Sequence, residues 1–214
     1  MAALKEYITN VLRKNTVAAD DSFYQPHENF SVISKEYHSI ILEVYQDLGG
    51  LNKEFPYVIS AYDIRLENAF IIIDDETVYN RYRAVTLRSG LYEKIKGINT
   101  ENHKRYCRQF ESECLKTAGS IHRWKSPESE KYFGPSQETG DLSTPGSSLW
   151  KLHAFKNFLT DVAALSMRKQ IFRISPYDNM LINGKMIKVK ELLLKRNEVN
   201  EGYLMKYIQR GLNS

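Results

Sequence analysis

The chain has 214 residues, of which 42% are apolar and 26% charged, a composition typical of a globular domain and not of a disordered chain. No apolar run approaches the roughly 20 residues that span a bilayer, and the first residues lack the apolar stretch of a signal peptide. With a net charge of +4 and only two cysteines, we expect a cytoplasmic protein without a membrane partner.

Apolar spacing predicts a mixed α/β fold, and the first half of the chain supplies helices and two strands. The run Phe70–Ile73 is apolar at every position, which is typical of a central strand with both faces buried. The expected elements are a helix over residues 2–14, a helix over 33–48 that ends at Gly49-Gly50, strands over 58–66 and 70–73, and helices over 79–97 and 101–117.

The second half is predicted to begin with a long loop. Residues 125–148 are rich in Ser, Gly and Pro, so we expect a mobile segment without secondary structure. Asn183-Gly184 is a type I′ turn signal. The expected elements are a helix over 149–169, a strand over 170–175, a hairpin over 180–189 and a helical tail from residue 192.

Four acidic residues are the candidate catalytic group. Asp63 lies near the end of one predicted strand, and Asp74, Asp75 and Glu76 directly follow the next. Carboxylates that meet at one edge of a sheet repel each other, and a divalent cation relieves that repulsion. Mg²⁺ held there would activate water and stabilise charge on a phosphoryl group. The alternative is that the run 74–76 only caps the following helix, where negative charge is favoured.

The order of these features resembles the core of the restriction-endonuclease-like, or PD-(D/E)XK, superfamily, in its very-short-patch-repair-like branch. In that branch a hairpin supplies one Asp, the next strand carries Glu-x-Asp, and a later helix leads to a strand with an Arg. Asp63 and Asp74 match the two aspartates. Residues 154–174, which include Asp161 and Arg173, match the later helix and strand.

The resemblance implies one domain over residues 1–214, with a mixed central sheet flanked by helices. Its restriction-endonuclease-like core would cover about 31–90 and 149–190, with a helical insertion over 91–148 and C-terminal helices over 191–214. It also implies metal-dependent hydrolysis of DNA phosphodiesters, with Asp63 and Asp74 as Mg²⁺ ligands and Asp75 or Glu76 as a replacement acid.

Two positions depart from the motif of that branch. Ile72 stands where the group has its Glu, and Val78 stands where it has a His. No Lys follows two residues after Asp74 or Asp75 either. An inactive nuclease-fold module that binds nucleic acid or a protein partner is therefore the alternative function.

A second resemblance is to an uncharacterised bacterial protein family. Its layout has Asn-Arg-Tyr-Arg, here residues 80–83, and Phe-Gly-Pro, here residues 133–135. Gly-Asp-Leu follows at 140–142, before a helix that begins with Trp150. This resemblance implies no biochemical function.

Charge is unevenly distributed along the chain. Residues 1–80 carry 13 acidic and 6 basic side chains, a net of −7, whereas residues 81–214 have a net of +11. The second part would attract nucleic acid, and the alternative is a solvated surface on helices. A protein partner or a homo-oligomer is the other partner that the sequence leaves open. The candidate nucleic-acid-binding residues are Arg81, Arg83, Lys151 and Lys156. The alternative for Arg81 is a structural ion pair.

One helix face carries residues that can hold a metal. His103 and Cys107 are one turn apart and could share a zinc ion, whereas Cys114 lies two turns further along. The alternative is a buried helix face with two small cysteines. The sequence also leaves His153 open as a general acid or base, or as a surface residue.

Overall fold

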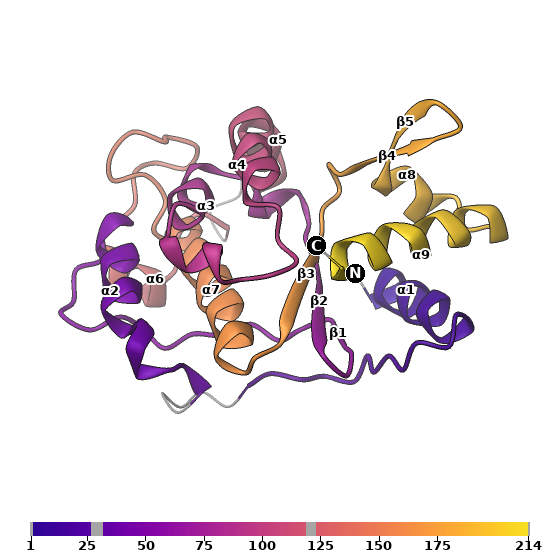
Figure 1. The fold of residues 1–214 in the computed structure, drawn as a ribbon. Helices are drawn as coiled ribbons and strands as arrows, with labels where there is room; N and C mark the ends of the chain where they lie inside the picture. The colour runs from indigo at the N-terminus through magenta and orange to yellow at the C-terminus, as the bar shows by residue number, and fades with distance from the viewer. Residues whose placement is uncertain (1, 27–31, 119–122, 214) are drawn as a thin grey trace.

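The computed structural model describes residues 2–26, 32–118 and 123–213. A small sheet lies at the centre of the molecule, and helices cover both of its faces (Figure 1). About 52% of the described residues are helix and 11% are strand, which confirms the mixed α/β class. No helix among the described residues is long and apolar enough to cross a membrane.

The central sheet has three strands in the order β1 (Ile64–Arg65), β2 (Ala69–Ile73) and β3 (Gln170–Ile174). Strand β1 pairs antiparallel with β2, and β2 pairs parallel with β3. All five residues of β2 are buried, which confirms the predicted central strand. Its β-branched isoleucines suit a strand that packs on both faces.

Alternate residues of β2 and β3 enter two separate apolar cores. Phe70, Ile72 and Ile171 face the larger core, which is built around the long helix α7 (Ser148–Ser166). Arg173 pairs in register with Ile72 and so belongs to this same face of the sheet. The helices α2 (His38–Asp47), α3 (Arg81–Thr86) and α6 (Pro127–Phe133) complete this layer.

The other face of the sheet is covered by helices from the two ends of the chain. Helices α1 (Ala2–Lys14), α8 (Val189–Leu194) and α9 (Glu198–Leu212) contribute to the smaller core. Lys14 of α1 forms an ion pair of 2.9 Å with Glu201 of α9, and the two helices lie side by side in Figure 1.

Helices α4 (Thr100–Gln109) and α5 (Glu111–Ala118) lie above the sheet in Figure 1. Short 3-10 helices form at Lys35–Tyr37, Glu76–Val78 and Gly90–Glu93. A separate hairpin, β4 (Asn179–Ile182) and β5 (Lys185–Lys188), projects from this end of the molecule. Its turn residues Asn183 and Gly184 have φ of 50° and 76°, as a type I′ turn requires.

Two predicted elements are shorter than expected. Within 58–66 only Ile64–Arg65 forms a ladder with β2. Tyr62 makes only an isolated bridge, to Tyr24, and Arg65 also bridges to Asp20. The helix predicted over 79–97 is divided into α3 and the 3-10 turn at Gly90–Glu93.

Two predictions about the middle of the chain are wrong. The helix over 101–117 breaks at Phe110, whose ring stacks on Tyr177 with centroids 3.7 Å apart. The segment 125–148 is not structureless, because it contains α6. Ser126 and Ser129 form a capping box there, and Phe133 is buried in the larger core.

Candidate functional site at the edge of the sheet

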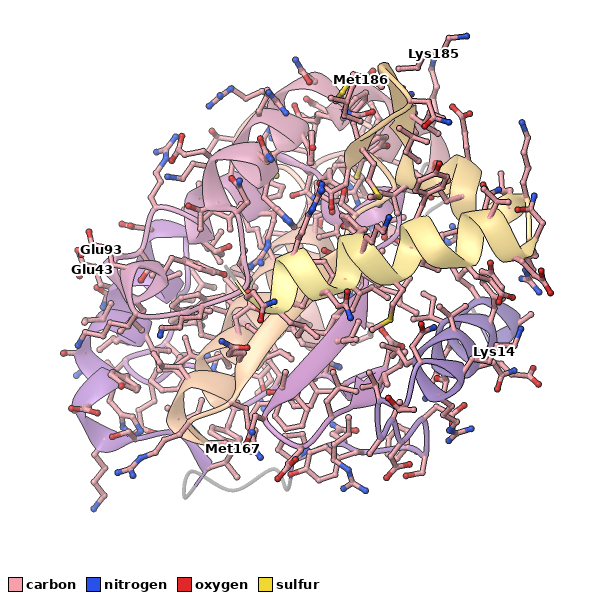
Figure 2. The ribbon with its side chains drawn as sticks, turned by 45° about the vertical axis from the view of Figure 1, so that its right-hand side comes forward. Lys14, Glu43, Glu93, Met167, Lys185 and Met186 are labelled. Carbon is pink, nitrogen blue, oxygen red and sulfur yellow. The ribbon has the colours of Figure 1, made fainter. Side chains whose placement is uncertain are left out.

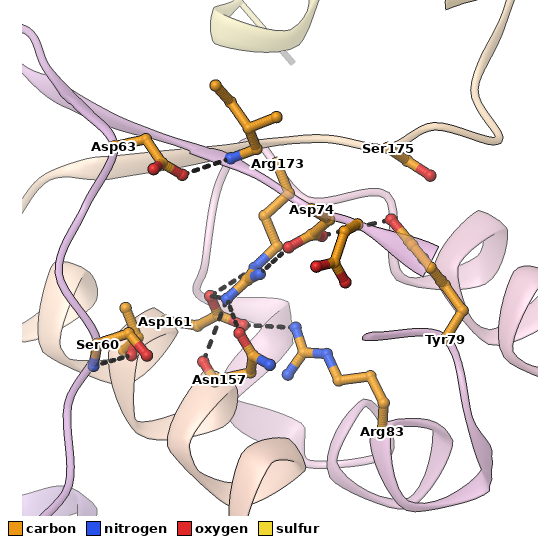
Figure 3. A network of polar contacts seen from close by, with 12 residues as sticks. Ser60, Asp63, Asp74, Tyr79, Arg83, Asn157, Asp161, Arg173 and Ser175 are labelled. Carbon is orange, nitrogen blue, oxygen red and sulfur yellow. Dashed lines mark hydrogen bonds and ion pairs between the residues drawn. The ribbon is translucent and has the colours of Figure 1, made fainter. Parts of the chain in front are cut away.

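Asp74 follows the last residue of β2 and points to the same side as Arg173 of β3. Its Oδ1 accepts a hydrogen bond of 2.5 Å from Nη1 of Arg173, and its Oδ2 accepts one of 3.3 Å from the Tyr79 hydroxyl. Only 1% of the Asp74 side chain is exposed. Figure 3 shows Arg173 between Asp74 and a second carboxylate, Asp161.

Asp161 lies at the centre of a buried polar network. Its Oδ1 accepts from Nε of Arg173 at 2.9 Å, and its Oδ2 accepts from Nη2 of Arg83 and the hydroxyl of Tyr92, each at 2.7 Å. The Asp161, Arg83 and Arg173 side chains are fully buried. Two arginines and two aspartates thus neutralise each other inside the apolar layer.

The surroundings shift the pKa of the two carboxyls in opposite directions. Burial opposes ionisation of Asp161, but Arg173 and Arg83 hold its pKa below the usual value. Burial raises the pKa of Asp74, although Arg173 opposes the rise. Asp161 is therefore the principal counter-ion of both arginines, and Asp74 is the weaker partner.

The next two acids of the run also have partners. Asp75 Oδ1 accepts from the backbone nitrogen of Thr77 at 2.9 Å, so it caps the 3-10 helix that follows. Glu76 pairs with Lys190 at 2.6 Å, and this contact lowers its pKa. The capping alternative is therefore confirmed for Asp75.

Asp63 immediately precedes β1, and its carboxylate is half-buried. Its Oδ2 accepts a hydrogen bond of 2.8 Å from the backbone nitrogen of Ile73, at the far end of β2. Burial raises the pKa of this carboxyl. This hydrogen bond connects Asp63 to the residue directly before Asp74, and Asp63 takes no part in the ion pair of Asp74 with Arg173 (Figure 3).

These carboxylates do not fit Mg²⁺ as they stand. A magnesium site needs oxygen ligands that converge on one point, and no group of three or more His, Cys, Asp or Glu residues does so in residues 2–26, 32–118 and 123–213. Asp74 already holds Arg173, whose charge excludes a second cation. A small cavity of about 230 Å³ opens beside Asp74, Asp75 and Glu76, and it also contains Lys190 and Arg196.

The four candidate nucleic-acid-binding residues have different surroundings. Arg81 is half-exposed and binds both carboxylate oxygens of Glu111, with N–O distances of 2.8 and 2.9 Å. Arg83 is fully buried, so a phosphate could reach it only by displacing Asp161. Lys151 is 7% exposed and lies over the ring of Tyr82. Lys156 is half-buried on α7, one residue from Asn157.

The break at Phe110 separates Cys114 from the candidate zinc pair, His103 and Cys107. His103 and Cys107 lie on α4, whereas Cys114 lies on α5, and both cysteines are free thiols in the core. Burial raises the pKa of each thiol to about 12 and lowers the pKa of His103 to about 3. A buried helix face is the interpretation that these positions support. His153 is exposed on α7, beside a cavity that Asp75 also lines.

Residues 43–195 match the model of a family of unknown function, DUF7255. The match covers more than two thirds of the chain. The chain belongs to this family. The DUF7255 region contains every residue named above in the buried network, whereas α1 and α9 lie outside it. Comparisons with curated proteins and with solved structures gave no match.

Sequence reasoning missed the pairing within the DUF7255 region. Arg83 and Asp161 are 78 residues apart, so no local spacing connects them. A signal was nevertheless present, because Arg173 interrupts the apolar run Ile171–Ile174 and Asp161 interrupts an apolar helix. Lone charges of opposite sign in buried elements predict a buried pair, since neither charge is tolerated alone.

Proposed function

We propose that this chain is a catalytically inactive nuclease-fold module that binds nucleic acid. The order of elements supports the nuclease-like ancestry. Asp63 precedes an antiparallel strand, Asp74 follows the central strand, and a helical crossover leads to a parallel strand that carries Arg173. This is the order that the resemblance to the restriction-endonuclease-like superfamily implies.

The ion pair between Asp74 and Arg173 is the main support for the proposal that the module is catalytically inactive. An active site needs Asp74 as a metal ligand, but here its carboxylate neutralises a buried guanidinium. A metal ion that took Asp74 would leave part of that charge uncompensated in the core, which is unfavourable. Ile72 and Val78, at the motif's Glu and His positions, supply no replacement ligand.

The projecting β4–β5 hairpin supports the nucleic-acid part. Lys185 and Lys188 are exposed on β5 and have no ion pair among the described residues. Leu181 and Met186 beside them are 64% and 66% exposed. Figure 2 shows Lys185 and Met186 at the outer end of the molecule. A two-stranded ribbon with lysines and apolar side chains suits a groove or an unpaired strand.

The hairpin belongs to the most basic end of the chain. Residues 179–213 carry seven basic and three acidic side chains. Arg81 and Arg83, which the sequence indicated for phosphate, are occupied by Glu111 and Asp161. We therefore assign phosphate contacts to the hairpin lysines rather than to helix α3.

The test is fluorescence anisotropy with labelled single-stranded and duplex DNA over a range of salt concentrations. Binding should weaken steeply with salt, because each neutralised phosphate releases counterions. Lys185→Ala with Lys188→Ala should lower the affinity and reduce the salt slope by about one to two. Lys35→Ala with Lys53→Ala, two exposed lysines of the acidic part, is the matched control and should change little.

The same protein and DNA samples test whether the module lacks nuclease activity. Wild-type protein should leave DNA intact in millimolar Mn²⁺. Cleavage that disappears in Asp74→Asn would show a working nuclease and overturn this part. Failure to bind any nucleic acid at low salt would overturn the binding part and favour a protein partner.

A further inference from the structure

A second cavity lies between α4, β3 and the C-terminal turn of α9, next to the hairpin. Its volume is about 350 Å³, within the usual range for sites that hold small molecules. Residues from α4, β3, the β4–β5 hairpin and α9 line it, among them His103, Arg105, Tyr106, Asp178, Tyr207 and Arg210. The acidic run Asp74–Glu76 is not part of this lining.

The charges that line this cavity favour an anion. Arg105 and Arg210 are exposed and have no ion pair in the part of the chain that the structure describes. The one carboxylate in the lining, Asp178, already accepts hydrogen bonds from the Tyr106 hydroxyl at 3.1 Å and from the Tyr207 hydroxyl. Arg173 also reaches the lining, but Asp74 and Asp161 balance its charge. Two cations therefore remain for a ligand.

Aromatic rings and neutral polar groups make up much of the remaining lining of the cavity. The rings of Phe172 and Tyr207 lie 5.3 Å apart by their centroids, and Asn102 and Asn179 add amide groups. His103 is 3% exposed, and its Nδ1 has no hydrogen-bond partner among the described residues. Buried polar atoms without partners are rare, and a bound molecule is one usual source of the missing partner.

We infer that this cavity binds one phosphorylated nucleoside unit, with its phosphate at Arg105 and Arg210 and its base beside the ring of Tyr207. Arginine suits phosphate because its planar donors match the phosphate oxygens. Aromatic rings accept any base by stacking, and the amides add hydrogen bonds to base edges. The nucleotide that binds is either a free mononucleotide or one nucleotide of a nucleic-acid strand. Binding of a strand rests on the proposed function.

The first experiment is calorimetric titration of the full chain with AMP, GMP, CMP and UMP, and separately with adenosine and with inorganic phosphate. At least one nucleoside monophosphate should bind at least tenfold more tightly than adenosine or phosphate. Arg105→Ala and Arg210→Ala should each weaken that binding about tenfold or more. Arg108→Ala on α4 and Lys206→Ala on α9 remove the same charge outside the cavity and should bind as the wild type does.

All four substitutions are at exposed positions, so thermal melting should show folded variants with similar midpoints. Unchanged affinity in Arg105→Ala and Arg210→Ala would overturn the inference. Equal affinity for inorganic phosphate and for the mononucleotides would also overturn it, because only a simple anion site would remain.

A labelled oligothymidylate separates this inference from the proposed function. If the strand binds the wild type and both arginine variants equally, the inference fails while the proposed function stands. If no strand binds at low salt but a mononucleotide binds through Arg105 and Arg210, the proposed function fails. The cavity would then be a site for free mononucleotides.

Discussion

Two aspartates and two arginines are buried together, and three ion pairs form among them. Asp161 binds both arginines, whereas Asp74 binds only Arg173. A buried ion pair adds little stability over a well-packed apolar pair, but loss of one partner leaves a buried charge uncompensated. The two carboxylates should therefore differ sharply in their effect on stability.

Asp161→Asn should lower the free energy of unfolding by about 3–5 kcal/mol, because Arg83 and Arg173 both lose their principal counter-ion. Asp74→Asn should lower it by less, since Arg173 keeps Asp161 and burial already disfavours the charged form of Asp74. Urea denaturation of the two isosteric variants measures the difference. Equal losses would contradict the assignment of Asp161 as the central counter-ion.

His103 should make stability dependent on pH. Burial, with Arg83 and Arg173 nearby, lowers its pKa to about 3, whereas the unfolded chain takes up the proton near pH 6.5. The neutral form of His103 therefore contributes fully to the free energy of unfolding above pH 6.5. This contribution is lost as the pH falls from 6.5 toward 3. At pH 5 the loss should be about 2 kcal/mol relative to pH 8.

His103→Asn should flatten the dependence of the unfolding free energy on pH between pH 6.5 and 5. Denaturation curves at several pH values provide the measurement. A variant that loses stability with the same slope as the wild type would show that other groups cause the loss.

At the scale of elements, the sequence predicted the pieces whose signal is local. Phe70–Ile73, the helix over 2–14 and the Asn183-Gly184 hairpin need only an apolar run, a periodic face or a turn residue. The break at Phe110 was not predictable, because it depends on Tyr177, far along the chain. The buried polar network was not predictable for the same reason, since the partners of Arg83 and Arg173 are set by tertiary contacts.

Gly97 lies between the Gly90–Glu93 turn and α4, packs against Ile171 of β3, and has a φ of +92°. A Cβ there would meet the backbone oxygen of Ile171 at 2.5 Å, so Gly97→Ala should force β3 and this segment apart. We expect a loss of about 2 kcal/mol, or roughly 4–8 °C in melting temperature.

Gly90→Ala is the matched control, because a Cβ at Gly90 would meet no atom within 4 Å. Its melting temperature should stay unchanged or rise slightly, since alanine restricts the unfolded chain. A similar drop in both variants would indicate that loss of glycine flexibility, and not the close approach to Ile171, is responsible.

The whole molecule is a sheet between two cores, and the two cores have different origins in the chain. The family region, 43–195, supplies the larger core almost completely. The smaller core depends on α1 and α9, which contribute Ile8, Leu12, Leu204 and Ile208. Without them, one face of β2 and β3 would be open to water.

A fragment of residues 43–195 should therefore bind a hydrophobic dye such as ANS and associate at micromolar concentration, whereas the full chain should not. The exposed face would carry Ile71, Ile73, Phe172 and Ile174. Dye fluorescence and size-exclusion chromatography of the two forms measure this. A monomeric fragment with no dye binding would show that the family region covers this face by itself.

The two cysteines offer a way to observe motion in the folded protein. Cys107 and Cys114 are the only thiols of the chain, and burial holds the pKa of both near 12. The thiolate is the nucleophile that attacks the disulfide of a thiol reagent, so neither cysteine should react until α4 or α5 opens. The rate of labelling by DTNB in native buffer should then report how often these helices separate from the core, and full denaturation should release both thiols at once. The unmodified protein thus carries its own probe of local unfolding.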